Sequence, residues 1–315
     1  EGRPAMSTAI STSLAPTVPG ARTSGRSGEV DRAILRTVLY AALFQAPLSV
    51  SQLHRALMDV GVDRIEIRGR LRRPYLRERI EQTGDYVYLR GREGCLDLHR
   101  ERRRRTADLL EAHGPLLRAM ARFPFVRLVA LSGACAHDNA TDSNVDVFLV
   151  VRGGRAWSVL LGLTLLSAAF GRRRTLSLNY VVDEEGAGLP ERDLLTAAEI
   201  VGLRPLAGGP GYLHFIEANA WVAERFPNFF WMRRDASPLP PAGAPRWLER
   251  ALDFGLAPAL EAIARRLLGA RFRRAWDGSS GVVLSPRRLK LHPVDHAPGL
   301  RAAFAEVVER AEADE

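Results

Sequence analysis

The sequence predicts a mixed α/β fold, of the α+β type, with more than one domain. Near the middle of the chain, two apolar runs of strand length are followed by a helix-length apolar run and a third strand-like run. Segments with helical spacing and a hairpin signal precede this region, and mostly helical patterns follow it. A chain of 315 residues lies at the upper edge of what one hydrophobic core supports, so two or three domains are expected.

The chain opens with a segment that we expect to be disordered. Residues 1–29 are rich in Ser, Thr, Pro and Gly and lack the apolar core of a signal peptide. The longest apolar run, Ala156–Phe170, is too short to span a bilayer. Cys95 and Cys135, the only cysteines, match neither a disulfide framework nor a zinc spacing. We therefore expect a cytoplasmic location and no membrane partner.

Residues 30–91 have the pattern of a winged helix. Apolar residues recur at helical spacing over Asp31–Phe44. A second helix begins at Ser49, which is placed to form a capping box with Gln52. A third helix fits Arg64–Arg73 and must stop at the proline that follows.

The wing of this domain is predicted as a hairpin. Two extended runs, Tyr75–Gln82 and Asp85–Leu89, flank a Thr-Gly turn. Winged helices often bind DNA, and seven arginines here are candidates for phosphate contacts: Arg64, Arg68, Arg70, Arg72, Arg73, Arg77 and Arg79. The alternative is a packing or oligomerisation module with a solvated basic face, because analogy of fold is a weak warrant for function.

One long linker helix is predicted over residues 92–124. It contains the basic block Arg100–Arg105, which could grip nucleic acid but on a helix is more often an exposed face. The net charge of +9 and the pI near 10.4 favour anionic partners such as nucleotides or nucleic acid. Lys290 is the only lysine, so biased codon usage could account for the arginine content without selection for phosphate binding.

The central region, residues 125–234, carries the candidate site. The strand run Val126–Leu131 ends in a small-residue turn, Ser132–Ala136, and the second strand run, Val145–Val151, has Asp146 near its start. A small-residue turn after a strand can let backbone N–H groups approach a phosphate closely. An acidic residue entering the next strand could then hold a divalent metal against that phosphate.

A helix and a third strand complete the predicted sheet. The helix fits Arg155–Phe170, and the strand Leu176–Val182 offers Asn179 in its middle. Arg172, in the connection between them, could contact a triphosphate, although basic residues after a helix also satisfy its dipole.

This stretch resembles the signature of the nucleotidyltransferase superfamily, which contains DNA polymerase β and kanamycin nucleotidyltransferase. That signature is a Gly-Ser turn after a strand, followed by Asp-x-Asp at the head of the next strand. Gly133 matches the glycine, and Ser143-Asn144-Val145-Asp146-Val147 aligns with the Ser-Asp-Ile-Asp-Leu form. From about residue 30 onward, the chain also resembles bacterial nucleotidyltransferase-domain proteins with a winged helix in front. The resemblance implies a small mixed sheet between a winged helix and a helical C-terminal region.

The signature is incomplete at three positions. Ala134 stands where the family has serine, and Asn144 stands where it has the first aspartate. A third carboxylate is often found on a later strand, where this chain offers Asn179. Of three expected metal-binding carboxylates, Asp146 is the one clearly present.

The resemblance implies transfer of a nucleotidyl group from a Mg²⁺-bound NTP to an unidentified acceptor. In that hypothesis the catalytic positions are Asp146 and Asn144, and the metal positions are Asp146, Asn144 and Asn179. The nucleotide-binding positions are Gly133, Ala134, Ser143 and Arg172. Two loop residues are conjectured substitutes for the missing carboxylate: Asp142 and Asp138. The alternative is a catalytically degenerate domain that acts as a nucleic-acid- or protein-binding module, regulatory or scaffolding.

Two further helices are predicted after the sheet, over Glu191–Leu203 and Tyr212–Arg225. In the resembling proteins a helical region at this point helps to form the substrate cleft. Glu199 and Asn219 are therefore cleft candidates, although residues of these types also serve as caps or surface groups.

Residues 246–315 are predicted to be mainly helical and to follow a proline-rich linker at 235–245. Pro258 should kink or split a helix over Arg246–Leu268, and the last helix is expected over Ala302–Ala313. Between these helices lie two short extended pieces, Gly281–Leu284 and Arg288–Leu291. His292 and His296 are four residues apart, but nearby prolines argue against the regular helix that a metal pair would need.

Overall fold

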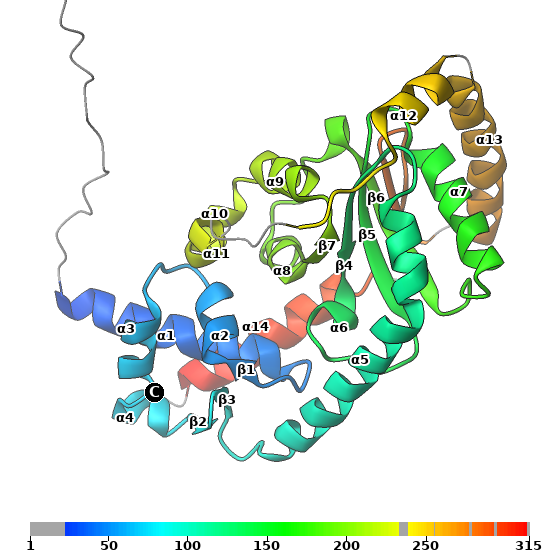
Figure 1. Cartoon of the computed structure of the whole chain (residues 1–315). Helices are drawn as coiled ribbons and strands as arrows, with labels where there is room; N and C mark the ends of the chain where they lie inside the picture. The colour runs from blue at the N-terminus through cyan, green and yellow to red at the C-terminus, as the bar shows by residue number, and fades with distance from the viewer. Residues whose placement is uncertain (1–22, 233–238, 255, 277–278, 293–294, 314–315) are drawn as a thin grey trace, which may run out of the picture.

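The computed structural model describes residues 23–232, 239–254, 256–276, 279–292 and 295–313. At its centre is a six-stranded sheet with the strand order β7-β4-β5-β6-β9-β8 (Figure 1). Its strands are β4 (Val126–Leu131), β5 (Val145–Val151), β6 (Leu176–Asp183), β7 (Arg204–Ala207), β8 (Val282–Leu284) and β9 (Arg288–Leu291). β5 and β6 are parallel, whereas the other described neighbours are antiparallel. The predicted mixed α/β class is confirmed.

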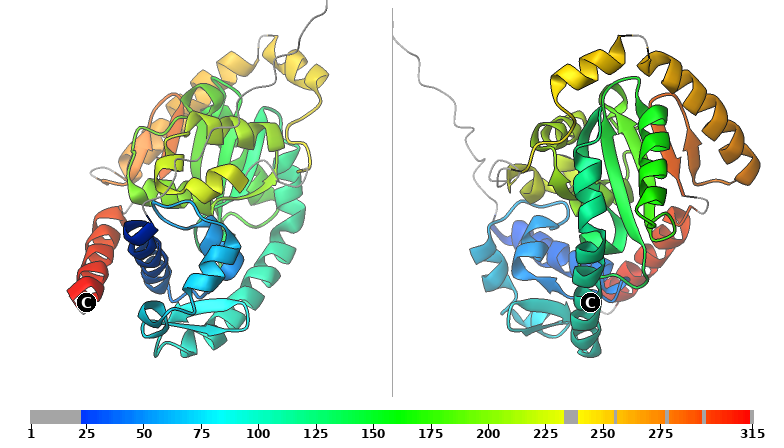
Figure 2. Two further views of the ribbon diagram at one scale, coloured as in Figure 1. Left: turned by 90° about the vertical axis from the view of Figure 1, so that its left-hand side faces the viewer. Right: turned by 45° about the vertical axis from the view of Figure 1, so that its right-hand side comes forward.

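Helices cover both faces of this sheet (Figure 2). One face packs against α5 (Gly94–Ala121), α7 (Ala156–Ala169) and α13 (Ala257–Ala275). The opposite face packs against α8 (Leu194–Gly202) and α9 (Gly209–Ala218). Because side chains alternate along a strand, the odd-numbered valines of β5 enter the first core and Phe148 enters the second.

The edge strands were not predicted as part of this sheet. β7 contains Pro205, which cannot donate a ladder hydrogen bond but is tolerated at an edge. β8 and β9 confirm the two extended pieces predicted within the mainly helical C-terminal region, and they join this sheet next to β6. That region also supplies α12 (Arg246–Asp253), α13 and α14 (Ala297–Ala313).

The N-terminal part contains the helices and hairpin of the predicted winged helix. Its helices are α1 (Thr23–Ala42), α2 (Val50–Arg55) and α3 (Arg64–Arg70), and its small sheet has the order β1-β3-β2. The strands are β1 (Leu48–Ser49), β2 (Ile80–Thr83) and β3 (Tyr86–Leu89). The capping box is confirmed, since Ser49 and Gln52 exchange side-chain-to-backbone hydrogen bonds of 3.2 and 2.8 Å.

Two local predictions in this part were wrong. Residues 23–29, expected in the disordered tail, form the first turns of α1. The other lies at Pro74, where the chain was expected to become extended but instead begins α4 (Pro74–Arg77). Proline is well accommodated in the first turn of a helix, where its missing N–H group has no intrahelical partner to lose. Residues 1–22 lie outside the described residues.

The N-terminal part packs directly against the helices that cover the sheet. One hydrophobic core runs from Leu53 and Leu57 on one side to Phe226 and Phe229 on the other. Asn228 ties the two parts together, because it accepts from the N–H of Val62 at 3.1 Å and donates to the carbonyl of His54 at 2.9 Å. The aromatic rings of Tyr40 on α1 and Phe304 on α14 also meet edge to face, 5.4 Å apart.

Several predicted helix boundaries differ in the structure. The helix expected over Tyr212–Arg225 is divided into α9 and α10 (Val222–Arg225), and α11 (Pro227–Met232) follows. As predicted, the helix containing Pro258 is split, and α12 and α13 are the two halves. Residues 235–238 of the predicted linker lie outside the described residues. No helix in the described part of the chain combines the length and the apolar character needed to cross a membrane.

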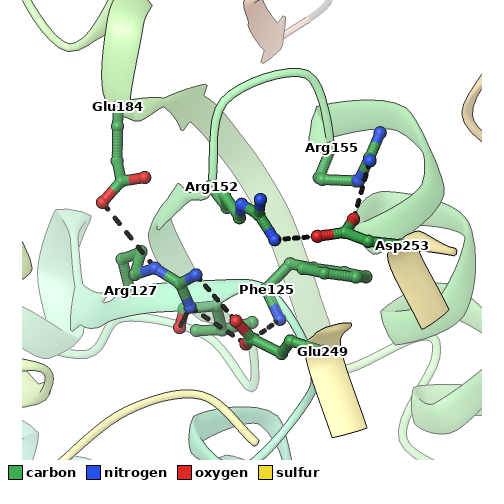
Figure 3. Close-up of polar contacts among 8 residues, drawn as sticks. Phe125, Arg127, Arg152, Arg155, Glu184, Glu249 and Asp253 are labelled. Carbon is green, nitrogen blue, oxygen red and sulfur yellow. Dashed lines mark hydrogen bonds and ion pairs between the residues drawn. The ribbon is translucent and has the colours of Figure 1, made fainter. Parts of the chain in front are cut away.

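A cluster of ion pairs fixes α12 to one end of the sheet (Figure 3). The buried carboxylate of Glu249 accepts two hydrogen bonds from Arg127, at 3.0 and 2.8 Å, and one from the N–H of Phe125 at 2.6 Å. Asp253 pairs with Arg152 and Arg155 in the loop after β5. Burial alone would raise the pKa of Glu249, but the hydrogen bonds from Arg127 and Phe125 outweigh it and hold this pKa below its usual range.

Candidate functional site

Three strands bring the predicted site residues to one end of the central sheet. β4 leads into a turn at Gly133, where the short helix α6 (Gly133–Ala136) begins, and β5 starts beside it. The parallel pairing of β5 and β6 sets Asp146 opposite Ser177. A register irregularity follows directly after this pair, and the hydrogen bonds show that Ser177 and Asn179 both reach the side of β5 on which Asp146 lies.

Asp146 is the centre of a hydrogen-bonded cluster. The side-chain amide of Asn144 donates to its Oδ1 over 2.9 Å, and the amide of Asn179 donates to the same oxygen. The hydroxyl of Ser177 donates to Oδ1 of Asn144 at 2.9 Å. The three positions that the resemblance aligns with carboxylates therefore meet in space. Ser177 was missed by the sequence analysis, although its place two residues before Asn179 puts it on the same side of a regular strand.

The turn at Gly133 lies directly against this carboxylate. Gly133 has φ +59°, and a Cβ atom built on it would lie 2.7 Å from Oδ2 of Asp146. Both the backbone conformation and the contact therefore favour glycine. The backbone is held as well, since the N–H of Ser132 donates to the carbonyl of Asp146 at 3.0 Å. The carbonyl of Ala134 accepts from the N–H of Asn139 at 3.0 Å, which closes the loop after the turn.

Cys135 is a packing residue of this turn. Its side chain is buried, and its thiol donates to the carbonyl of Asn144 at 3.4 Å. Burial, with the nearby charge of Asp146, raises the pKa of Cys135 to about 11. The thiol is therefore protonated at neutral pH and is a poor nucleophile.

The electrostatics of Asp146 reflect a half-buried anion with neutral partners. Burial raises the pKa of the Asp146 carboxyl, the hydrogen bond from Asn179 lowers it, and the charge of Asp142 raises it further. The net direction is upward. The two amide donors therefore offset only part of the desolvation cost of this carboxylate.

The loop residues considered as substitute carboxylates have other contacts. Asp142 is exposed and accepts a hydrogen bond from the N–H of Asn144 at 2.9 Å. Asp138 forms a 2.9 Å ion pair with Arg204 on β7. No hydrogen bond joins either carboxylate to the side chain of Asp146 in the described part of the chain. Ser143 is exposed.

The two cleft candidates have different environments. Asn219 is fully buried and bonds the N–H of Leu189 and the carbonyls of Ala187 and Phe215, each at 2.8 Å. The hydrogen bonds of its side chain thus hold the loop before α8. The prediction that Asn219 lies in a substrate cleft was wrong, and its role is structural. Glu199 is exposed on α8 and stays a candidate.

The donor set at Asp146 does not fit a magnesium site of the expected kind. Mg²⁺ in nucleotide enzymes is usually held by one or two carboxylates together with substrate phosphates, and here two of the three aligned positions are neutral amides. A cation at Oδ1 of Asp146 would have to displace both N–H donors. Across the described residues, no group of three or more His, Cys, Asp or Glu side chains is arranged to hold a metal.

Comparisons with protein-family models, with curated proteins and with solved structures found no match for this chain. The interpretation of the Asp146 cluster therefore depends on its own geometry and on the resemblance of its sequence signature.

Proposed function

We propose that this chain is a nucleotidyltransferase-like protein that does not carry out metal-dependent nucleotidyl transfer. Its central domain instead binds a nucleotide and serves as a binding module. One observation carries the proposal. The amides of Asn144 and Asn179 both donate to a single oxygen of Asp146, at positions where the resembling family has carboxylates. The carboxylate of Asp146 keeps its charge, but its Oδ1 already accepts two hydrogen bonds, and the neutral amides add no further negative charge to attract a divalent cation.

An anionic ligand is favoured by the residues that surround the cluster. Arg172 is half-buried in the connection that leads into β6, and Arg173 and Arg174 beside it are exposed. This connection lies at the same end of the sheet as Asp146, because the N–H of Val145 donates to the carbonyl of Thr175 at 3.0 Å. No ion pair within the described residues engages these three arginines. They are therefore available to phosphate oxygens.

The competing function is nucleotidyl transfer with Mg²⁺. It is favoured by the convergence of all three aligned positions beside the Gly133 turn, which is the arrangement that the resemblance implies. In this alternative the NTP phosphates would supply most of the metal ligands.

Calorimetric titration with ATP, GTP, CTP and UTP distinguishes the two functions. We expect at least one nucleotide to bind equally well in Mg²⁺ and in EDTA, with no release of pyrophosphate. Arg172→Ala should weaken this binding several-fold, whereas Arg118→Ala on α5 should not. Nucleotide binding that requires Mg²⁺ and is lost in Asp146→Asn would overturn the proposal in favour of an active transferase. No binding by any nucleotide would remove the nucleotide from the proposal.

A variant with restored carboxylates sharpens this test. Asn144→Asp combined with Asn179→Asp brings three carboxylates together, which should create a Mg²⁺ dependence that the natural chain lacks. If nucleotide binding by the natural chain already depends on Mg²⁺, and to the same degree as in the double variant, the proposal is contradicted. Melting curves in EDTA are the control, because three adjacent carboxylates without a cation should lower Tm.

A further inference from the structure

Helix α13 presents an apolar stripe to solvent. Four large side chains on or just before this helix are 49 to 63% exposed: Leu256, Leu260, Ile263 and Leu267. Their spacings of four, three and four residues place them along one line of the helix surface. Single exposed apolar residues are ordinary on protein surfaces. A continuous seam of four is the pattern by which one helix recognises another.

The stripe is not a result of loose packing. The inward side of α13 buries Ala257, Ala264 and Leu268 against the core that contains α7. Its one acidic residue, Glu261, accepts hydrogen bonds from the N–H groups of Trp157 and Ser158 at 3.0 and 2.8 Å. These bonds satisfy donors at the start of α7 that the helix itself cannot pair. Figures 1 and 2 show α13 running alongside α7 as the outermost helix on this side.

Helix α12, which precedes the stripe, is fixed by the ion-pair cluster at the end of the sheet. Glu249 and Asp253 hold α12 by hydrogen bonds to Arg127, Arg152 and Arg155 (Figure 3). α13 itself is anchored along its inner side, by its packing against α7 and by the hydrogen bonds of Glu261. Its outer apolar residues lie on a rigid support, which lowers the entropic cost of binding a partner.

Basic residues continue and flank the stripe. Five arginines follow Ile263 on the same helix, and none of them forms an ion pair with a described residue: Arg265, Arg266, Arg271, Arg273 and Arg274. Arg266, Arg271 and Arg274 share one surface patch with Leu267. The patch therefore combines apolar contact area with unneutralised positive charge.

This charge argues against a second copy of the chain as the occupant. Two α13 helices packed in parallel would bring arginine against arginine, which is unfavourable when the surroundings are desolvated. Packed antiparallel, they would leave the arginines without carboxylate partners on the other helix, because Glu261, the one acidic residue of α13, is bonded to α7. A complementary surface carries leucine-like side chains along one line and carboxylates beside them. From Leu256 to Arg274 the stripe and its basic end extend about 27 Å at 1.5 Å per residue, which matches a helix of about five turns.

We propose that the outer face of α13 is a docking site for an acidic amphipathic helix of a partner protein. The apolar line of the partner would pack between Leu260, Ile263 and Leu267, and its carboxylates would pair with Arg266, Arg271 and Arg274. This site lies across the sheet from Asp146, since α13 covers one face and Phe148, on the side of Asp146, enters the opposite core. The docking site and the nucleotide site are thus independent, and either proposal can fail alone.

The test uses fluorescence anisotropy with two labelled synthetic helices and the full chain. Both peptides have 18 residues (a length from the rise per residue) and the same leucine seam. One carries Glu beside the seam, and the other carries Lys. We expect the Glu peptide to bind at least tenfold more tightly than the Lys peptide, and this preference to shrink as salt is added. Equal binding of the two peptides, or no binding of the Glu peptide, overturns the proposal.

Variants separate the stripe from the rest of the surface. Leu260→Ser with Leu267→Ser should weaken binding of the Glu peptide at least tenfold. Leu165→Ser, a change at a 62% exposed residue on α7, should leave it unchanged. Melting curves confirm that each variant is folded, which is expected because the changed residues lie outside the core.

Two parallel measurements test the other possible occupants of the stripe, a second copy of the chain and a lipid surface. Sedimentation of the unlabelled chain should show no dimer that depends on the stripe. Such a dimer would be recognised by its loss in the variant that combines Leu260→Ser with Leu267→Ser. Vesicles of phosphatidylserine and phosphatidylcholine should not compete with the Glu peptide. A stripe-dependent dimer, or binding to vesicles in place of the peptide, contradicts the proposed partner class.

Discussion

Asn179 on β6 donates a hydrogen bond to Asp146 on the neighbouring parallel strand, to the oxygen that also accepts from Asn144. Two neutral amides thus solvate a carboxylate that burial disfavours. Hydrogen bonds to the charged form lower the pKa of an acid, whereas desolvation raises it. For Asp146 the desolvation dominates, so that the cluster retains its anion at some cost to the folded state.

This balance predicts how the stability conferred by Asp146 depends on pH. Since the folded-state pKa of Asp146 is raised above its unfolded value, the folded chain holds the proton more tightly. The free energy of unfolding should therefore fall as pH rises from the usual range of an aspartate through the raised pKa. Asp146→Asn removes this titration, so its Tm relative to the natural chain should improve with rising pH.

Thermal melts of both proteins, from acid to neutral pH, measure that difference. Asp108→Asn is the matched control, because Asp108 is exposed on α5 and should give a small offset in Tm. A relative Tm of Asp146→Asn that stays flat, or that improves towards acid pH, is inconsistent with the raised pKa.

Gly133→Ala should destabilise the chain for two separable reasons. Alanine at φ +59° costs about 1 kcal/mol, and its Cβ would lie 2.7 Å from Oδ2 of Asp146. Gly171→Ala is a control for the first term alone, since Gly171 has φ +67° with no atom within 4 Å of an added Cβ. Urea unfolding should show that Gly133→Ala lowers the free energy of unfolding by about 1–3 kcal/mol more than Gly171→Ala does.

A double variant isolates the contact with the carboxylate. Combining Gly133→Ala with Asp146→Ala should recover most of the difference between the two glycine variants, because the clashing atoms are gone. If the losses of unfolding free energy in the two single variants simply add in the double variant, contact with the carboxylate is not the cause of the extra destabilisation by Gly133→Ala.

Glu249 should contribute strongly to stability, in contrast to the exposed ion pairs. Its side chain is 7% exposed and satisfies Arg127 together with the N–H of Phe125. Glu249→Ala leaves these donors unpaired and should cost about 3 kcal/mol. Glu306→Ala, which removes an ion pair with Arg310 between side chains that are 61 and 73% exposed, should cost under about 1 kcal/mol.

The contribution of Glu249 should also depend on pH. Its pKa is lowered in the folded state, so its stabilising effect is complete above the usual pKa of glutamate and is lost as pH falls through the lowered value. Chemical unfolding at neutral and acid pH should show the gap between the natural chain and Glu249→Ala narrowing in acid. A constant gap would contradict this assignment.

The predictable parts of this fold are those with strong local signals. β4 and β5 have the predicted bounds, since each is a buried apolar run flanked by small or polar residues. β9 has the bounds of the extended piece predicted at Arg288–Leu291, whereas β7 was not predicted as a strand. Both are short and begin with arginine, so neither has the composition that would place it in a buried sheet. Their place in the sheet is set by tertiary pairing with β4 and β6.

The candidate site shows the same division. The sequence signature contains Gly133, Asn144, Asp146 and Asn179, and the structure brings these four residues together. Ser177 was not predicted as a site residue, because its contact with Asn144 depends on how β6 pairs with β5. The burial of Asn219 could not be predicted either, since it depends on the loop that contains Ala187 and Leu189, about 30 residues earlier in the chain, packing against the end of α9.

DNA binding by the winged helix stays a prediction, and the structure selects the arginines that test it. Arg64 and Arg68 are exposed on α3, and the 3.8 Å ion pair of Arg68 with Asp85 joins side chains that are 63 and 56% exposed. Arg70 is only 12% exposed and pairs with Asp31 at 3.4 Å and Glu66 at 2.8 Å, so it is a structural residue. Arg73 also pairs with Asp31, at 3.6 Å. The seven arginines of this region are therefore not equivalent.

Fluorescence anisotropy with a labelled duplex, at several salt concentrations, measures their roles. Arg64→Ala with Arg68→Ala should weaken binding to every DNA sequence by a similar factor and reduce the slope of log affinity against log salt by about 2. Arg70→Ala should instead lower Tm. In the protein that remains folded, it should leave the slope of log affinity against log salt unchanged, because Asp31 and Glu66 already neutralise the charge of Arg70. An unchanged slope in the double variant, or no binding by the natural chain at low salt, would favour the alternative that this N-terminal part is a packing module.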